Sequence, residues 1–252
     1  MEAYGGFAEV YDLFMDNVDY DAWAEDLLRH LKHYGVESGL IAELGCGTGN
    51  LTERLAAAGY HMWGIDLSPD MLAAAEEKRQ QSGLDILYLN QDMCELELPC
   101  SVDAVICACD GLNYLLTEEE LLQVFERVRA VLAPDGVFLF DMNTRAKFRE
   151  IGETTIAENR EEGSFIWENY FEEESGINSY ELTLFVRQPD SGLYEKYEET
   201  HLQRAYEPAL IRQLLERAGL RCDRVWQAFS EEAVSEGTER ICFAARMEST
   251  AK

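Results

Sequence analysis

The stretch at positions 43–50, ELGCGTGN, constrains the chain more than any other. It follows a short apolar run at 40–42 and precedes a helix-compatible segment at 51–56. Gly45, Gly47 and Gly49 lack a Cβ atom, so they can adopt positive φ angles and let a ligand approach bare backbone. A strand that turns into a helix through such a loop predicts a nucleotide-like ligand at the turn.

The spacing of these glycines separates two classes of ligand. A dinucleotide fingerprint is G-x-G-x-x-G, but here Asn50 occupies the position of the third glycine, which comes one residue early at Gly49. No lysine follows the loop, which excludes a Walker-type phosphate cradle. The loop therefore favours a ligand without phosphate.

Strands and helices alternate after this loop, and polar residues follow the strands. Pro69 after Ser68 marks a helix start, as does the capping box of Thr117 and Glu120. This order predicts an α/β fold with a doubly wound, mostly parallel sheet, which binds ligands beyond the carboxyl ends of its strands. The expected strands are 40–42, 60–65, 86–89, 102–109 and 137–140, and the expected helices are 71–81 and 121–132.

The pattern changes after the fifth strand. Three runs with period-2 alternation, beginning near Phe165, Tyr180 and Tyr194, are separated by turn signals. They predict an antiparallel β insertion at 152–206. A helix from Pro208 to Gly219 and strands near 221–229 and 240–246 complete the chain. The predicted organisation is a helical N-terminal cap at 1–37, a ligand-binding domain at 38–151 and 207–252, and the insertion as a lid over the substrate.

The first forty residues predict two amphipathic helices. Phe7, Val10, Tyr11 and Phe14 follow helical spacing, and a second apolar series runs from 20 to 34. The simplest interpretation is a cap packed on the main domain. The alternative is that aromatic residues of this segment, Tyr4 among them, reach over the ligand.

Charge limits the partners of the chain. Its 252 residues include 49 acidic and 21 basic residues, which gives a net charge of −28. Such a field disfavours nucleic acid and anionic membranes and favours a cationic ligand. Seven scattered cysteines without a CxxC pair indicate reduced thiols rather than a metal site or disulfides. With no long apolar stretch, the chain is expected to be cytoplasmic, and its oligomeric state stays open.

These motifs together resemble the class I, Rossmann-like S-adenosylmethionine-dependent methyltransferases. ELGCGTGN resembles the first motif of that family, GIDLSPDML at 64–72 the second, QDM at 91–93 the third, and DGVFLFDM at 135–142 the fifth strand. The likeness covers about 38–145 closely, and the overall layout is similar to a small-molecule-type bacterial branch. It implies a seven-stranded sheet whose last strand is antiparallel and lies between the fifth and sixth.

The resemblance also implies a set of residues that bind S-adenosyl-L-methionine. Asp66 would accept both ribose hydroxyls, Asp92 would accept a hydrogen bond from the adenine amino group, and Glu43 would orient the loop or the ammonium group. The implied cofactor-binding residues are Glu43, Gly45, Cys46, Gly47, Gly49, Asp66, Leu67, Met71, Gln91, Asp92, Met93 and Cys109.

The end of the fourth strand should face the methyl group. It reads CDGLNY at 109–114, without the (Asp/Asn)-Pro-Pro-(Tyr/Phe) sequence of enzymes that methylate exocyclic amines of nucleobases or glutamine. The roles of His201 and Arg204 in the acidic insertion stay open, as does the use of a general base. The candidate catalytic residues are Tyr11, Asp110, Asn113, Tyr114 and His201.

Three functions are compatible with these residues. The leading hypothesis is a methyltransferase that acts on a small molecule. The alternatives are a non-catalytic, S-adenosylmethionine-binding regulatory protein, and a methyltransferase that acts on protein or RNA.

Overall fold

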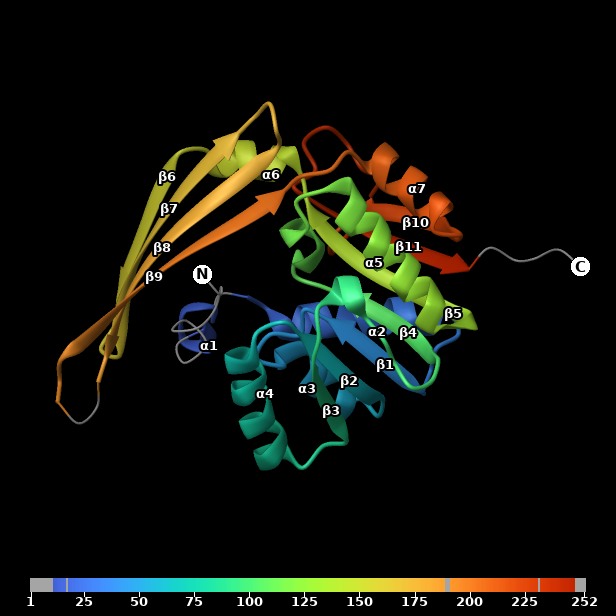
Figure 1. Cartoon of the computed structure of the whole chain (residues 1–252), viewed down its shortest axis with the longest axis horizontal. Helices are drawn as coiled ribbons and strands as arrows, with labels where there is room; N and C mark the ends of the chain where they lie inside the picture. Colours follow the sequence, from blue (N-terminus) through green and yellow to red (C-terminus); the bar gives the residue numbers. More distant parts are fainter. Residues whose placement is uncertain (1–10, 17, 189–190, 231, 248–252) are drawn as a thin grey trace, which may run out of the picture.

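A seven-stranded sheet and a four-stranded sheet form the framework of the protein. The structure is a computed structural model that describes residues 11–16, 18–188, 191–230 and 232–247. The larger sheet has the strand order β10-β11-β5-β4-β1-β2-β3 (Figure 1). Its strands are β1 (Leu40–Leu44), β2 (His61–Asp66), β3 (Ile86–Asn90), β4 (Val102–Cys107), β5 (Leu132–Asn143), β10 (Leu220–Gln227) and β11 (Arg240–Met247).

The direction of the last strand agrees with the sequence prediction. β11 pairs antiparallel with both β5 and β10, whereas the pairs among β1 to β5 are parallel. The fold class is therefore confirmed as a doubly wound α/β fold with one reversed strand between the fifth and sixth. Because β11 runs backwards, its first residue, Arg240, lies beside Asn143 at the carboxyl end of β5.

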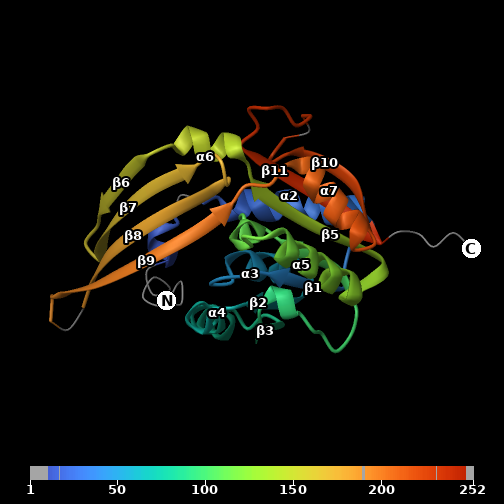
Figure 2. The same ribbon diagram turned by 45° about the horizontal axis from the view of Figure 1, so that its top comes forward.

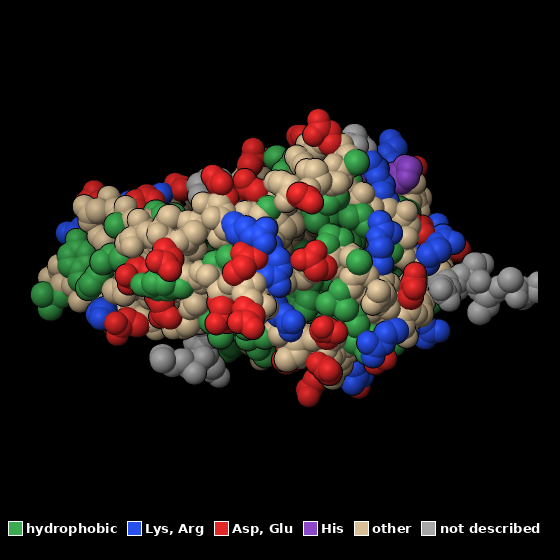
Figure 3. All heavy atoms as spheres, turned by 90° about the horizontal axis from the view of Figure 1, so that it is seen from above, with side chains coloured by type: hydrophobic (Ala, Val, Ile, Leu, Met, Phe, Trp, Pro, Cys, Tyr) green, Lys and Arg blue, Asp and Glu red, His purple; other side chains and the backbone are tan. Residues whose placement is uncertain are grey.

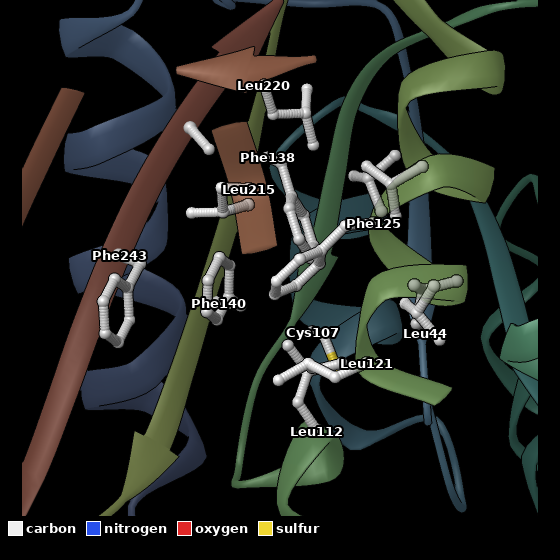
Figure 4. Close-up of a cluster of buried hydrophobic side chains, with 14 of the residues drawn as sticks. Leu44, Cys107, Leu112, Leu121, Phe125, Phe138, Phe140, Leu215, Leu220 and Phe243 are labelled. Atoms are coloured by element: carbon white, nitrogen blue, oxygen red, sulfur yellow. The ribbon is translucent and has the colours of Figure 1, made fainter. Parts of the chain in front are cut away.

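Helices cover both faces of the larger sheet. α5 and α7 pack on one face, where Phe125 and Leu215 meet Phe138 and Phe140 (Figure 4), and α2 and α3 pack on the other. Thr117 caps α5 in the predicted capping box, and Ser68 caps α4 before Pro69. The helices are α2 (Tyr20–His33), α3 (Asn50–Ala57), α4 (Pro69–Ser82), α5 (Glu118–Val131) and α7 (Pro208–Arg217), with short 3-10 helices η1 (Met93–Glu95) and η2 (Gly111–Tyr114).

The insertion is a curved antiparallel sheet that extends away from the main sheet (Figures 1 and 2). It contains four strands in sequential order, so the prediction of three was wrong. β6 lacks the period-2 signal because its side chains are almost all exposed. A short helix, α6 (Arg145–Ile151), precedes it and was not predicted. The strands are β6 (Thr154–Asn159), β7 (Gly163–Glu172), β8 (Ile177–Arg187) and β9 (Tyr194–Arg204).

The two N-terminal helices pack on different parts of the protein. Within the described residues, the first helix is only α1 (Tyr11–Phe14); Tyr4, Phe7 and Val10 lie outside them. Phe14 is buried and packs edge-on against Phe165 of β7, with ring centroids 5.0 Å apart. α1 therefore contacts the insertion rather than the main sheet alone, whereas α2 packs on the main sheet as predicted.

Two strand ends differ from the prediction. β4 ends at Cys107, because Cys109 and the next residue have φ angles of 57° and 58°, outside the extended region. β5 begins at Leu132, directly after α5, so that Pro134 and Gly136 lie within the strand instead of before it. A register shift between Val102 and Ala104 of β4 accommodates this early start.

Asn113 joins the insertion to the main sheet. Its amide nitrogen donates to the carbonyl oxygens of Asn143 and Arg204, at 3.0 and 2.8 Å. Its carbonyl oxygen accepts the N–H of Asn143 at 2.9 Å. The side chain is fully buried, so each of these bonds satisfies a backbone group that water cannot reach. Asn113 thus holds the end of β5 beside the end of β9.

No helix of the described residues is long and apolar enough to cross a membrane. On the face of the molecule shown in Figure 3, acidic side chains are widely spread and basic side chains stand close to them.

Replacing Asn113 with alanine is expected to lower the free energy of unfolding by about 2 to 4 kcal/mol, because buried backbone groups lose their partners. Urea denaturation followed by circular dichroism measures the change. Asn159→Ala, on the exposed edge strand β6, is the matched control and should stay within about 0.5 kcal/mol of the wild type. An Asn113 variant as stable as this control would contradict the anchoring role.

Candidate active site

A cavity of about 520 Å³ lies beyond the carboxyl ends of β1 to β4. Its walls come from the glycine loop and from the segments that follow β2, β3 and β4, with Tyr11 and Tyr20 added from the N-terminal helices. This volume suits a ligand of nucleoside size. The position agrees with the rule that doubly wound sheets bind ligands at this edge.

Most of the implied cofactor residues meet at this cavity. Gly49 is the exception and lies behind the wall. The cavity is lined by Glu43, Gly45, Cys46, Gly47, Asp66, Leu67, Met71, Gln91, Asp92, Met93 and Cys109.

Only some of the candidate catalytic residues line the cavity. Tyr11 and Tyr114 line the cavity, whereas Asp110, Asn113 and His201 do not. Sequence reasoning missed several lining residues. The helical spacing of Tyr20 indicates a core residue, which hides its place at the cavity. Thr48 and Asn50 lie within the glycine motif itself, so that motif could have identified them. The missed polar residues are Tyr20, Thr48, Asn50, Ser68, Asp70 and Glu120.

The glycine loop adopts the predicted backbone conformation. Gly45, Gly47 and Gly49 have φ angles of 66°, 54° and 78°. Gly49 also begins α3, and a Cβ atom there would collide with the hydroxyl of Tyr88 and press on Ala75. Gly49 therefore serves the packing of the loop against β3 and α4, which explains why it does not face the cavity.

Asp66 fixes the two loops that border the cavity. One carboxylate oxygen accepts the N–H of Gly47 and the other accepts the N–H of Ser68, both at 2.8 Å. Burial raises the pKa of Asp66, and these hydrogen bonds partly offset the effect. Leu67 adds a third backbone hydrogen bond, and because a carboxylate offers about four lone-pair sites, Asp66 can still accept a hydrogen bond from a ligand.

Glu43 lies at the bottom of the cavity with 4% of its surface exposed. Burial raises its pKa to about 7, and the negative charge of Asp66 adds to the rise. The hydroxyl of Thr52 donates to Glu43 Oε2 at 2.5 Å, and this hydrogen bond lowers the pKa. Near neutral pH the carboxyl is therefore present in both protonation states.

The loop after β3 is held by its own side chains. Asn90 Nδ2 donates to the backbone carbonyls of Asp66 and Leu67, at 3.0 and 2.8 Å. Asp92 Oδ1 accepts the N–H of Cys94 at 2.8 Å and so starts η1. These bonds place Gln91, Asp92 and Met93 on the cavity wall next to the end of β2.

A charged cluster supports the turn after β4. Arg240 donates to Asp110 Oδ1 at 2.7 Å and to Asp141 Oδ2. Asp110 Oδ2 accepts from Gln203 of β9 at 2.6 Å, and its N–H donates to Asp141 at 3.1 Å. Burial raises the pKa of Asp141 to about 6, although Arg240 opposes the rise. Asp110 thus supports the turn after β4 and is not among the residues that line the cavity.

His201 lies behind the cavity wall. It is buried, and its ring meets the ring of Tyr114 edge-on, with centroids 6.1 Å apart. Its Nε2 lies 3.1 Å from Oε2 of Glu199, which is also buried. The insertion therefore contacts Tyr114 from the side opposite the cavity.

α1 is held by both parts of the protein (Figures 1 and 2). Asp12 accepts from Thr48 and Asn50 of the glycine loop, both at 2.7 Å, and forms an ion pair with Lys78 of α4. On the other side, Arg160 of the insertion pairs with Asp16 and also donates to a carbonyl of α1. This arrangement places Tyr11 over the cavity.

The charged groups of the cavity wall all have one sign. The described residues that line it include five carboxyl side chains and no lysine, arginine or histidine. Such a wall suits a cationic ligand without phosphate, which is the charge pattern of S-adenosylmethionine. Among the described residues, no group of three or more His, Cys, Asp or Glu side chains could hold a metal ion. The lining carboxyl residues are Glu43, Asp66, Asp70, Asp92 and Glu120.

Comparisons with known proteins agree on one class. The family model described as "Methyltransferase domain" matches residues 41–136. The chain is 40% identical to a putative methyltransferase, GWCH70_2453, from Geobacillus sp. (strain WCH70), over 96% of this chain and 99% of that one.

Two further relatives add the structure and a chemistry. A crystal structure of an S-adenosylmethionine-dependent methyltransferase from Clostridium acetobutylicum superposes with a TM-score of 0.85 at 31% identity, covering 98% of this chain and 99% of that one. A dTDP-3-amino-3,6-dideoxy-alpha-D-glucopyranose N,N-dimethyltransferase from Streptomyces fradiae is 30% identical over 54% of this chain and 53% of its own length.

Glu43→Gln is expected to change how stability depends on pH. Because burial raises the folded pKa of Glu43 above its ordinary value of 4.5 to about 7, the wild type loses stability as the pH rises from about 4.5 through 7. The neutral glutamine avoids this loss. The variant should gain up to about 3 kcal/mol relative to the wild type between pH 4.5 and 8. Urea denaturation across this range measures the difference.

Thr52→Val provides the opposite change at the same site. It removes the hydrogen bond that lowers the pKa of Glu43, so the loss of stability should extend to higher pH than in the wild type. Asp141 titrates in the same range in all three proteins, and it cancels in the comparison. Parallel curves for the wild type and Glu43→Gln would show that Glu43 does not titrate near pH 7.

Lys78→Ala is expected to loosen α1. The variant removes the ion pair with Asp12, and losing about 1 kcal/mol raises the population of an opened segment about fivefold. Hydrogen–deuterium exchange of the peptide that contains residues 11–16 measures this opening. Lys32→Ala, an exposed lysine of α2, is the control. Equal exchange in both variants would mean that Lys78 does not hold α1.

Proposed function

Since the chain belongs to the class I, Rossmann-like S-adenosylmethionine-dependent methyltransferase family, we propose that it transfers a methyl group to a small-molecule acceptor. The observation that carries this proposal is the cavity at the carboxyl ends of β1 to β4. Its wall contains the glycine loop, and the only charged side chains among its described lining residues are carboxylates. When bound there, S-adenosylmethionine supplies a methyl carbon already activated by a positively charged sulfur.

The residues present fit this cofactor. Asp66 has acceptor capacity left for a ribose hydroxyl, because a carboxylate offers about four lone-pair sites and its backbone hydrogen bonds come from Gly47, Leu67 and Ser68. Met71 and Met93 offer apolar surface for the adenine ring, and Asp92 lies at the end of the neighbouring strand. Glu43 lies at the base of the glycine loop, where its carboxylate form would favour the ammonium group of the methionine part.

The surroundings of the cavity favour a small acceptor. Tyr11 of α1 lines the cavity, and α1 is tied to the glycine loop on one side and to the insertion on the other. A net charge of −28 disfavours RNA, whose phosphates would be repelled. The relative from Streptomyces fradiae is named for methylating an amino sugar nucleotide, which is a small molecule. We propose that the insertion and α1 together act as the lid over this acceptor.

The protein's part in the reaction is placement. Methyl transfer from a sulfonium is an in-line displacement, so the side chains must hold the acceptor atom opposite the leaving sulfur. Effective molarities of about 10⁵ M or more show how much such alignment can contribute. The lid would also keep water away from the reacting atoms.

Asp66→Ala is expected to weaken the binding of S-adenosylmethionine by about 10- to 100-fold, because hydrogen bonds to a charged carboxylate are lost. Isothermal titration calorimetry with S-adenosylmethionine and S-adenosylhomocysteine measures both affinities. Asp85→Ala is the matched control: this exposed carboxylate lies at the opposite end of β2 and β3, beside His61.

Thermal unfolding should show that both variants keep a cooperative transition. Unchanged affinity in Asp66→Ala, or absence of binding to the wild type, would contradict the cofactor assignment. Binding of the cofactor without transfer to any metabolite, protein or RNA would favour the non-catalytic alternative.

A further inference from the structure

Three tyrosines form one part of the cavity wall. Tyr11 comes from α1, Tyr20 from the start of α2 and Tyr114 from the end of η2. We call them the tyrosine cluster. A hydrogen bond joins the side chains of Tyr11 and Tyr20, and both Tyr114 and Cys109 lie close enough to act electrostatically on Tyr11. The cluster therefore gathers at the carboxyl end of β4, where the methyl group is expected.

The tyrosine cluster offers oxygen atoms and aromatic faces but no cation. The basic side chains around it are already paired with carboxylates. Arg54, which lies 5.6 Å from the ring centroid of Tyr20, pairs with Asp21. Lys78 pairs with Asp12, Arg160 with Asp16, and Arg240 with Asp110 and Asp141. An acceptor that presents an anionic group to this wall would meet no partner of opposite charge among the described lining residues. A neutral or cationic acceptor suits it better.

The tyrosines of the cluster are themselves poor general bases. Burial raises the pKa of Tyr11 well above its usual range and that of Tyr20 to about 12. Both phenols therefore stay protonated near neutral pH. His201 is separated from the cavity by the ring of Tyr114 and is engaged with Glu199. Glu43 lies below the glycine loop beside β4, where its Oε2 accepts a hydrogen bond from Thr52.

These features discriminate between acceptor atoms. A hydroxyl group is a weak nucleophile that needs a base to remove its proton during attack, whereas a neutral amine already has a free lone pair. We propose that the acceptor atom is an amine nitrogen of a small molecule bound against the tyrosine cluster. This inference rests on the proposed function and makes it more specific.

The step needs no further reactant. The nitrogen lone pair forms a bond to the methyl carbon, and the carbon–sulfur bond breaks with its electron pair remaining on sulfur. The products are S-adenosylhomocysteine and a methylated ammonium, which then releases one proton to water. The phenol oxygens of the cluster accept N–H hydrogen bonds from the amine and so direct its lone pair toward the methyl group. The aromatic faces can stabilise the positive charge that forms on nitrogen.

The test uses S-adenosylmethionine with a radioactive methyl group and an ultrafiltrate of a bacterial cell extract, which contains its small molecules. One half of the extract is treated with the N-hydroxysuccinimide ester of acetic acid, which converts primary and secondary amines to amides and leaves alcohols intact. The other half receives the same reagent after quenching. We expect the full-length enzyme to label the control half and to lose about tenfold or more of this transfer in the acylated half, because an amide nitrogen has no free lone pair.

Two results would overturn different claims. Labelling that persists in the acylated extract would show that the acceptor atom is not a primary or secondary amine, as the proposed step requires, and would leave methyl transfer standing. Labelling of neither extract by a protein that binds the cofactor would contradict the proposed function itself.

Variants of the cluster test its role with the labelled acceptor. Tyr114→Phe should lower kcat/KM by about tenfold through the loss of one hydrogen bond, while cofactor affinity measured by calorimetry stays unchanged. Tyr170→Phe, on the exposed face of the insertion, is the matched control and should behave as the wild type. Equal kcat/KM in the two variants would exclude Tyr114 from acceptor binding.

Discussion

The position of Arg240 between Asp110 and Asp141 is the contact on which the turn after β4 depends. Two carboxylates next to each other, one fully buried, would repel and would be costly to remove from water. The guanidinium group bridges them and lies over the ring of Trp23 in α2, 5.5 Å from its centroid. With the carboxylates held in this way, the chain can turn through Cys109 and Asp110, both in left-handed conformation. That turn carries Gly111 and Tyr114 to the cavity wall.

This turn also ties the insertion to the catalytic domain. Gln203 donates to Asp110, the carbonyl of Arg204 accepts from Asn113, and the hydroxyl of Tyr206 donates to Leu115. A displacement of β9 would therefore move the segment that carries Tyr114. α1 connects the same two parts a second time through Asp12 and Arg160. The turn after β4, the glycine loop and the insertion are thus connected to one another, although these segments come from distant parts of the sequence.

Features that depend on neighbouring residues could be predicted from the sequence. The glycine loop, the caps at Ser68 and Thr117 and the polar residues after the strands are local signals, and together they located the cavity. Contacts made by tertiary packing could not be predicted. Arg240 follows Asp110 by 130 residues, and only the reversed direction of β11 brings it to the carboxyl end of β5. β6 carries no alternating pattern because it is an exposed edge strand, and the backbone partners of the Asn113 side chain lie 30 and 91 residues away in the sequence.

The carboxyl groups of the cavity wall determine how the site responds to a cation. A cavity with five carboxyl groups would repel itself if all were ionised, and burial relieves this by favouring the neutral form of Glu43 near pH 7. A cation that enters would favour the ionised form again, so binding would release a proton from Glu43. The empty cavity avoids the cost of a buried, unpaired charge, and the filled cavity gains an opposite charge at its base. A wall of neutral side chains would lack this response, and a wall with lysine or arginine would repel the sulfonium.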